Sequence, residues 1–191
     1  INSIKKYLES YGVNVYSTRE PGGTKCGESL RNILLNNKTI ISPEAELLLL
    51  FAIRKQHIDE IIKDKLSLGT WVLCDRYIDA SIAYQGYGKK VSLKKIKILI
   101  ENFTDNINPD LTIFFDLPYS LSKKRFPKNK KKDRFENLNN KFFNDVYDGY
   151  VSIANNNKKR IKRVDANCSK EDVFSQITSI IDTKFKHDLI L

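Results

Sequence analysis

The sequence predicts a three-layer α/β fold in which helices cover both faces of a doubly wound parallel sheet. Helical patterns and short apolar runs alternate along the chain. The runs 71–74 and 111–115 each follow a helical pattern and end at an acidic residue, Asp75 and Asp116 respectively. Short apolar runs with polar boundaries are typical of strands buried on both faces. Because ligands of such sheets bind beyond the carboxyl ends of the strands, we expect functional residues directly after them.

The other elements are predicted from the same two patterns, the helical spacing of apolar residues and the short apolar run. Apolar side chains in residues 1–10 have helical spacing that ends before Gly12, and 13–17 is a short β-type run. A long helix, predicted from Ser42 to about Leu68, begins with a capping hydroxyl, a proline at the first helical position and an acid in its first turn. Further helices are predicted over 93–103, 141–153 and 170–185, and one more strand around Val164.

Length and composition fit one domain spanning residues 1–191. Hydrophobic residues make up 41% and charged residues 29%, and no apolar run approaches the roughly 18 residues that cross a bilayer. Residues 1–10 do not resemble a secretory signal, so we expect a cytoplasmic protein with no membrane partner. Cys26, Cys74 and Cys168 have no histidine at metal-ligand spacing, which predicts neither a zinc site nor a disulfide framework.

The formal net charge of +10 is compatible with a nucleic-acid surface or with a site for small polyphosphates. Lysine greatly outnumbers arginine, and Ile and Asn are abundant, a composition that AT-rich coding produces without selection on function. The chain lacks the interleaved aromatic platform of a sequence-tolerant strand-binding protein. We therefore expect no nucleic-acid partner.

Two segments at strand ends have residues suited to phosphate chemistry. Arg19 and Glu20 precede a Pro-Gly-Gly turn that allows backbone to approach a ligand closely, although an ordinary turn with a surface ion pair is an equally good interpretation. After the next strand, Asp75 can hold a hydrated magnesium ion and Arg76 can form a fork to a phosphate. Downstream, Ser81, Tyr84 and Gln85 have the spacing of one helix face, and this polar and aromatic face suits a nucleoside.

A basic segment at about 125–136, R-F-P-K-N-K-K-K-D-R-F-E, is expected to form a loop or lid. Phosphoryl transfer is catalysed mostly by positioning and by cations that stabilise the developing charge. For the lysines 130–132 a solvated run is the better interpretation. Arg125 and Arg134, which flank the run, are the stronger catalytic candidates.

Together the motifs resemble those of bacterial thymidylate kinases, in order and at similar intervals over essentially the whole chain. The matching strings are T-R-E-P-G-G-T (18–24), S-P-E-A-E-L-L-L (42–49), D-R-Y-I-D-A-S-I-A-Y-Q-G-Y-G (75–88), N-P-D-L-T (108–112) and D-R-F-E (133–136). The resemblance implies a P-loop nucleoside monophosphate kinase fold and transfer of the γ-phosphoryl group of ATP to dTMP, with Mg²⁺. It also implies a homodimer.

At the acceptor phosphate, the resemblance implies that Arg76 binds the dTMP phosphate and bridges donor to acceptor, and that Arg31 also contacts the monophosphate. Glu20 is implied to lie near this phosphate and the magnesium ion, as a catalytic and metal-site residue. Asp75 is implied to hold the metal through water.

At the base, the resemblance assigns Arg54 to the thymine carbonyl, Ser81 and Gln85 to the far side of the ring, and Tyr84 to the sugar. On the ATP side, it implies that Arg125, Arg134 and the neighbouring Lys128 close over the phosphates. The segment bordering the adenine corresponds to Asp165, Ala166 and Asn167.

The sequence departs from the family at two places. The phenylalanine that usually stacks on thymine is replaced by Leu50, with Phe51 beside it, so we expect weaker nucleotide binding rather than a different reaction. The second departure concerns the first strand and the ATP phosphate loop, G-x-x-x-x-G-K-[ST], because no such string occurs in the chain. We expect these residues upstream of Ile1.

Three alternatives remain open from sequence. A kinase for another nucleoside monophosphate would prefer dCMP, dUMP or AMP. A catalytically inactive thymidine-nucleotide-binding remnant would bind dTMP without phosphorylating it. A nucleic-acid-binding protein would bind DNA with steep salt dependence.

Overall fold

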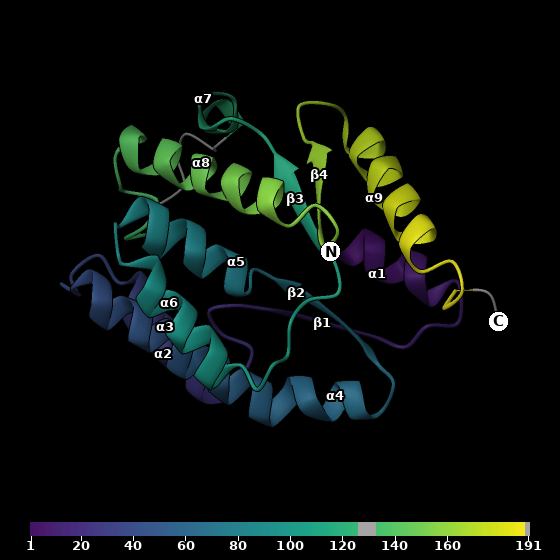
Figure 1. The fold of residues 1–191 in the computed structure, drawn as a ribbon, viewed down its shortest axis with the longest axis horizontal. Coiled ribbons are helices and arrows are strands. Elements are labelled where there is room, and N and C mark those ends of the chain that lie inside the picture. The colour runs from purple at the N-terminus through teal and green to yellow at the C-terminus, as the bar shows by residue number, and fades with distance from the viewer. Residues whose placement is uncertain (126–132, 190–191) are drawn as a thin grey trace.

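A computed structural model describes residues 1–125 and 133–189 and confirms the α/β class (Figure 1). Its described part contains the strands β1 (Val15–Arg19), β2 (Trp71–Asp75), β3 (Thr112–Asp116) and β4 (Ile161–Asp165). The predicted strands at 71–74, 111–115 and around Val164 thus form within a residue or two of their expected bounds.

The strands form two parallel pairs. β1 pairs with β2, with Arg19 opposite Asp75, and β3 pairs with β4, with Asp116 opposite Asp165. In the described residues no ladder joins β2 to β3, so the expected sheet consists of two separate halves. The halves are joined by apolar packing: one core cluster contains Val15 from the first pair and Val164 from the second, together with side chains of the flanking helices.

Helices cover the strand pairs. Two helical segments contain a π-helix, one between α3 and α4 and one directly after α5. In Figure 1, α1 and α9 lie side by side at one end of the molecule, while α2, α3 and α6 lie together at the other. The bounds are α1 Asn2–Glu9, α2 Lys25–Leu35, α3 Pro43–His57, the π-helix η1 Ile58–Ile62, α4 Lys63–Ser67, α5 Ile78–Ser81, the π-helix η2 Ile82–Gly88, α6 Leu93–Phe103, α7 Tyr119–Ser122, the 3₁₀ turn η3 Lys123–Arg125, α8 Asn140–Asn156 and α9 Lys170–Lys184.

The predicted caps are present. The Ser42 hydroxyl accepts a hydrogen bond from the Ala45 backbone N–H at 3.4 Å, with Pro43 in the first turn of α3. The helix expected to reach Leu68 is α3, η1 and α4 in succession, ending at Ser67 with Gly69 following at a φ of +71°. Within the described ranges, every helix is too short or too polar to span a bilayer.

Candidate active site

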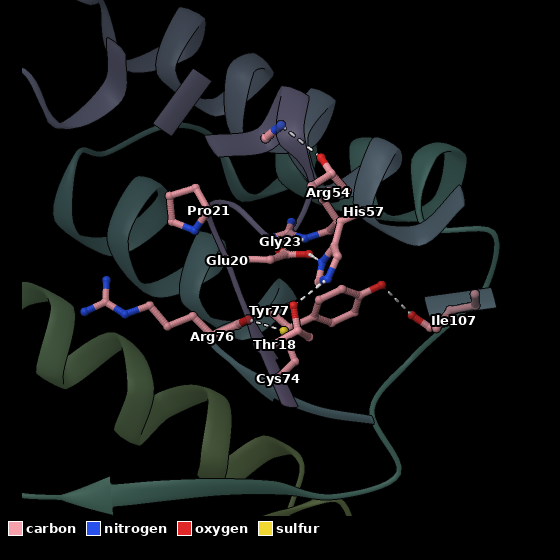
Figure 2. Close-up of polar contacts among 12 residues, drawn as sticks. Thr18, Glu20, Pro21, Gly23, Arg54, His57, Cys74, Arg76, Tyr77 and Ile107 are labelled. Carbon is pink, nitrogen blue, oxygen red and sulfur yellow. Dashed lines mark hydrogen bonds and ion pairs between the residues drawn. The ribbon is translucent and has the colours of Figure 1, made fainter. Parts of the chain in front are cut away.

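The register of β1 and β2 brings the T-R-E and D-R-Y segments together. Arg19 and Asp75 are opposite each other at the carboxyl ends of the two strands, and the Glu20 backbone N–H donates to the Asp75 carbonyl at 2.9 Å. Parallel strands end at the same edge of a sheet, so two segments that are far apart in the sequence lie together at this edge, which we call the rim. The site residues are arranged around this rim (Figure 2).

Glu20 lies at the centre of a buried hydrogen-bond network. One carboxylate oxygen accepts from Arg54 Nε at 2.7 Å, and the other lies 3.1 Å from His57 Nδ1. The second nitrogen of His57, Nε2, lies 2.8 Å from the Thr18 hydroxyl. The exposed fractions of Glu20, Arg54 and His57 are 5%, 2% and 0%, so the ion pair and the imidazole are shielded from solvent.

The Arg54 guanidinium is fixed on several sides but has one free donor. Nη2 donates to the Ser81 hydroxyl at 3.0 Å, and the group lies 4.7 Å from the centre of the Phe51 ring and 5.1 Å from that of Tyr77. Nη1 is buried without a hydrogen-bond partner in the described part of the chain. Burying a donor without a partner costs free energy of folding. The unpartnered Nη1 therefore points to an acceptor on a ligand.

Three further arginines lie where an anion is expected. Arg31 Nη1 donates to the Pro21 carbonyl at 2.7 Å, and Arg19 Nη2 pairs with Glu28 at 2.9 Å. Burial, then the charge of Arg19 and, more weakly, that of Arg76, lower the pKa of Arg31, which means that these cations repel one another. Such a cluster is stabilised by an anion.

Arg76 has a left-handed backbone, with φ of +67°, and its guanidinium lies 5.0 Å from the centre of the Tyr84 ring. Its side chain is exposed and extends away from the Glu20 network (Figure 2). The strained turn after β2 therefore directs Arg76 to one side of the rim while Tyr77 packs against Arg54 on the other.

Ser81 and Gln85 face α3, whereas Tyr84 faces α8. Ser81 binds Arg54, and Gln85 Nε2 donates to Glu46 Oε1 at 2.9 Å. Tyr84 makes edge contacts with Phe142 and Tyr150 of α8. The predicted shared face is thus divided, because residues 82–88 form a π-helix with more residues per turn than an α-helix.

The residues predicted to act on the ATP side are only partly brought together. Arg125 Nη1 donates to the Ala166 carbonyl at 2.8 Å, which joins the start of the basic segment to the loop with Asp165 and Asn167. Arg134 instead donates to the Leu34 carbonyl at 2.7 Å and to buried Glu46. Its guanidinium is therefore anchored on α2 and α3. Lys128 lies outside the described residues.

The contacts bear on two predicted roles. Both oxygens of Glu20 accept hydrogen bonds in a buried site, from Arg54 and from His57, and its assigned role near the magnesium ion stays a prediction. Phe51 is not a base-stacking residue, because its ring is 2% exposed and packs in a core cluster with Leu47 and Ile96. Leu50 is half-buried and keeps its place in the prediction.

The Asp75 carboxylate is free to bind a ligand. Asp75 is exposed at the end of β2, and its carboxylate has no hydrogen-bond or ion-pair partner among the described residues.

The potential ligand atoms of Glu20, His57 and Cys74 lie within 4.8 Å of one another, which sequence spacing did not indicate. Burial and the Glu20 charge raise the pKa of the Cys74 thiol, and Arg54 already neutralises Glu20, so this cluster does not suit a cation.

Sequence reasoning missed His57 and Glu46. His57 follows Arg54 by three positions on α3, a spacing that places both on one face and was the available signal. Glu46 has no comparable signal, since an acid near a helix start is common.

Two cavities, of ≈ 580 Å³ beside Asn14 and Thr70 and ≈ 460 Å³ beside Asn155 and Arg160, lie at the amino ends of strands, away from the rim.

Comparison with known proteins identifies the family. The family model described as thymidylate kinase matches residues 1–177. Thymidylate kinase from Nitrosomonas europaea is 38% identical over 94% of this chain and 83% of its own length, and that from Vesicomyosocius okutanii is 41% identical over 95% and 89%. A crystal structure of thymidylate kinase from Ehrlichia chaffeensis superposes with a TM-score of 0.77 at 31% identity, covering 94% of this chain and 89% of that chain. With most of its length matched by the family model and by these relatives, the chain belongs to the thymidylate kinase family.

Proposed function

We propose that the chain transfers the γ-phosphoryl group of ATP to dTMP, giving dTDP and ADP, as a step towards dTTP in the cytoplasm. The observation that carries this proposal is the free Nη1 of Arg54, a buried donor held in place by Glu20 and Ser81. Thymine presents a carbonyl oxygen where cytosine presents an amino group. A fixed N–H donor can donate to the carbonyl oxygen but not to the amino group, which would leave the donor unpaired.

The phosphate of the acceptor is assigned to the arginine cluster. Arg76, beyond the strained turn, extends away from Arg54 (Figure 2), and Arg31 donates to the Pro21 carbonyl. This separation suits a nucleotide, whose base and phosphate lie at opposite ends. Positive charge at this position stabilises the oxygens of the transferring group and aligns the acceptor oxygen that attacks the γ-phosphorus while ADP leaves.

The donor side is assigned to Arg125 and the 165–167 loop, which are in contact. Asp75 would hold a hydrated magnesium ion, which supplies charge neutralisation at the donor phosphates when bound. Arg134 supports the lid through Glu46 rather than contacting phosphate directly. We also propose that residues 1–191 act as a single domain with the lid at about 125–136.

A homodimer is part of the proposal. Leu48 on α3 and Ile98 and Phe103 on α6 are exposed by 57%, 47% and 45%, and these two helices pack against each other. Exposed apolar side chains gathered on neighbouring helices are typical of a surface that another protein covers. A second copy of the chain is the occupant that the family resemblance favours.

The acceptor site can be tested without ATP, which matters because the chain contains no G-x-x-x-x-G-K-[ST] string. Isothermal titration calorimetry with dTMP, dCMP and thymidine measures the base and phosphate contributions separately. We expect dTMP to bind about tenfold or more tightly than dCMP. Arg31→Ala should weaken dTMP binding but leave thymidine binding unchanged, because thymidine has no phosphate.

Lys158→Ala, an exposed lysine of the loop before β4, is the control and should alter neither ligand. Equal affinity for dTMP and dCMP would remove the base assignment. A loss of thymidine binding in Arg31→Ala would remove the phosphate assignment.

A further inference from the structure

His57 lies in the middle of a chain of hydrogen bonds that ends at the free donor of Arg54. Thr18, at the end of β1, contacts His57 Nε2 at 2.8 Å, and His57 Nδ1 lies 3.1 Å from Glu20 Oε1. The other oxygen of Glu20 accepts from Arg54 Nε at 2.7 Å. Residues from β1, the turn after it and α3 are thereby joined in one buried network (Figure 2).

The chemistry of the groups assigns each hydrogen bond a direction. A carboxylate can only accept, so His57 Nδ1 donates to Glu20. A neutral imidazole then has its lone pair at Nε2, which accepts from the Thr18 hydroxyl. Glu20 therefore receives two donors, one at each oxygen, and its orientation is determined by both.

This arrangement controls where the Arg54 guanidinium lies. Without the hydrogen bond from His57 Nδ1, the Glu20 carboxylate could rotate so that Oε1 accepts from Arg54 Nη2 and forms a two-point fork, in competition with Ser81. The fork would draw the guanidinium towards Glu20 and displace Nη1 from its present position. His57 opposes this by holding the carboxylate in its present orientation.

The imidazole is itself held by the glycine turn. A Cβ at Gly23 would come within 2.7 Å of His57 Cδ2 and Nε2, so the ring packs directly on the Gly23 backbone. The same turn contains Pro21, whose carbonyl binds Arg31. His57 thus contacts the segment that positions the phosphate arginine as well as the acid that positions the base arginine.

We propose that His57 is a positioning residue that sets the preference for thymine over cytosine, acting through Glu20 on Arg54. The proposal rests on the assignment of Arg54 to the base. His57 does not contact the nucleotide, and its effect is to keep the Arg54 donor aimed at a carbonyl oxygen.

Two variants that each replace the imidazole by a side-chain amide, His57→Asn and His57→Gln, distinguish this positioning role from a merely structural one. The amide of Asn reaches the position of Nδ1, so His57→Asn keeps the donor to Glu20. The longer Gln reaches the position of Nε2, so His57→Gln keeps the contact with Thr18 and loses the donor to Glu20. The measured quantity is the ratio of the Kd for dCMP to the Kd for dTMP, from calorimetry on the whole chain, with thermal stability recorded alongside.

We expect His57→Asn to retain most of the wild-type ratio and His57→Gln to lower it by about tenfold, the scale of one lost hydrogen bond to a charged group. His187→Leu, which alters the exposed second histidine, is the control and should leave the ratio unchanged. The proposal is wrong if both His57 variants keep the wild-type ratio, or if both weaken dTMP and dCMP equally. A wild-type protein with no preference for dTMP would instead overturn the base assignment itself, so the two failures are distinguishable.

Discussion

Asp79 and Arg160 form a two-point ion pair that connects the two halves of the sheet. Arg160 Nη1 lies 2.7 Å from Asp79 Oδ2, and Nη2 lies 2.7 Å from Oδ1. Asp79 is on α5, which follows β2, whereas Arg160 precedes β4, and Thr112 at the start of β3 donates to Asp79 at 3.0 Å. Because no ladder joins β2 to β3 in the described residues, this pair is a polar link where backbone hydrogen bonds are lacking.

Replacing Arg160 by Met should lower the free energy of unfolding by roughly 3 kcal/mol, because Asp79, 5% exposed, is left as an uncompensated buried charge. Urea denaturation at neutral pH measures the change. Arg163→Met is the matched control, since the Arg163 side chain is 42% exposed where it pairs with Asp116, and its loss should cost less than about 1 kcal/mol. Similar losses in the two variants would show that burial of the pair does not determine its contribution.

Gly23→Ala should destabilise the protein more than Gly69→Ala. Both glycines have positive φ, +85° and +71°, so alanine at either site has backbone strain of roughly 1–2 kcal/mol. At Gly23 the new methyl would also meet the His57 ring, while nothing lies within 4 Å at Gly69. Thermal denaturation and dTMP titration should both be affected at Gly23. An equal cost at both sites would mean that the turn does not hold the imidazole.

Glu46→Gln should lower the free energy of unfolding by roughly 3 kcal/mol, since the acid is completely buried and pairs with Lys89 Nζ at 2.7 Å and with Arg134. Its removal leaves Lys89 and Arg134 without their shared anion. Glu44→Gln, two positions earlier on α3, removes a carboxylate that is 61% exposed and pairs with Lys95, and it should have little effect. Chemical denaturation compares the variants, and equal stability would contradict the role of Glu46.

Acidification should remove the contribution to stability of a surface ion-pair network, which is formed by Lys55, Lys63, Asp59 and Asp105. Hydrogen bonds from Lys55 and Lys63 lower the pKa values of Asp59 and Asp105 below their ordinary 3.8. Groups with a depressed folded pKa stabilise the protein above the unfolded pKa, and this stabilisation is lost as the pH falls through the folded value. The Tm of the wild type should therefore exceed that of Asp105→Asn at neutral pH, and the difference should shrink below about pH 4.

A difference that stays constant from about pH 7 to pH 3 would contradict this assignment. High salt offers a second check, because exposed pairs of this kind are screened. The Asp105→Asn difference should therefore decrease in salt at neutral pH as well.

Much of the secondary structure was determined by local sequence. Ser42, Pro43 and the apolar runs specify their elements through hydrogen bonding, a fixed φ and burial, which act within a few residues. The motifs at 18–24 and 75–88 likewise indicated the chemistry, because parallel strands deliver their ends to one edge. Arg76 was recognisable for the same reason, whereas Arg31 and Arg54 were assigned only through the family resemblance.

Tertiary structure decided which partners those residues meet. Glu20 binds Arg54 and His57, Gln85 and Arg134 converge on Glu46, and Phe51 packs in the core. The π-helical turn at 82–88 and the division of the sheet into two pairs also depend on packing between distant segments. A carboxylate near a strand end can accept from an arginine, a histidine or a hydrated ion, and only the fold determines which of these is close enough.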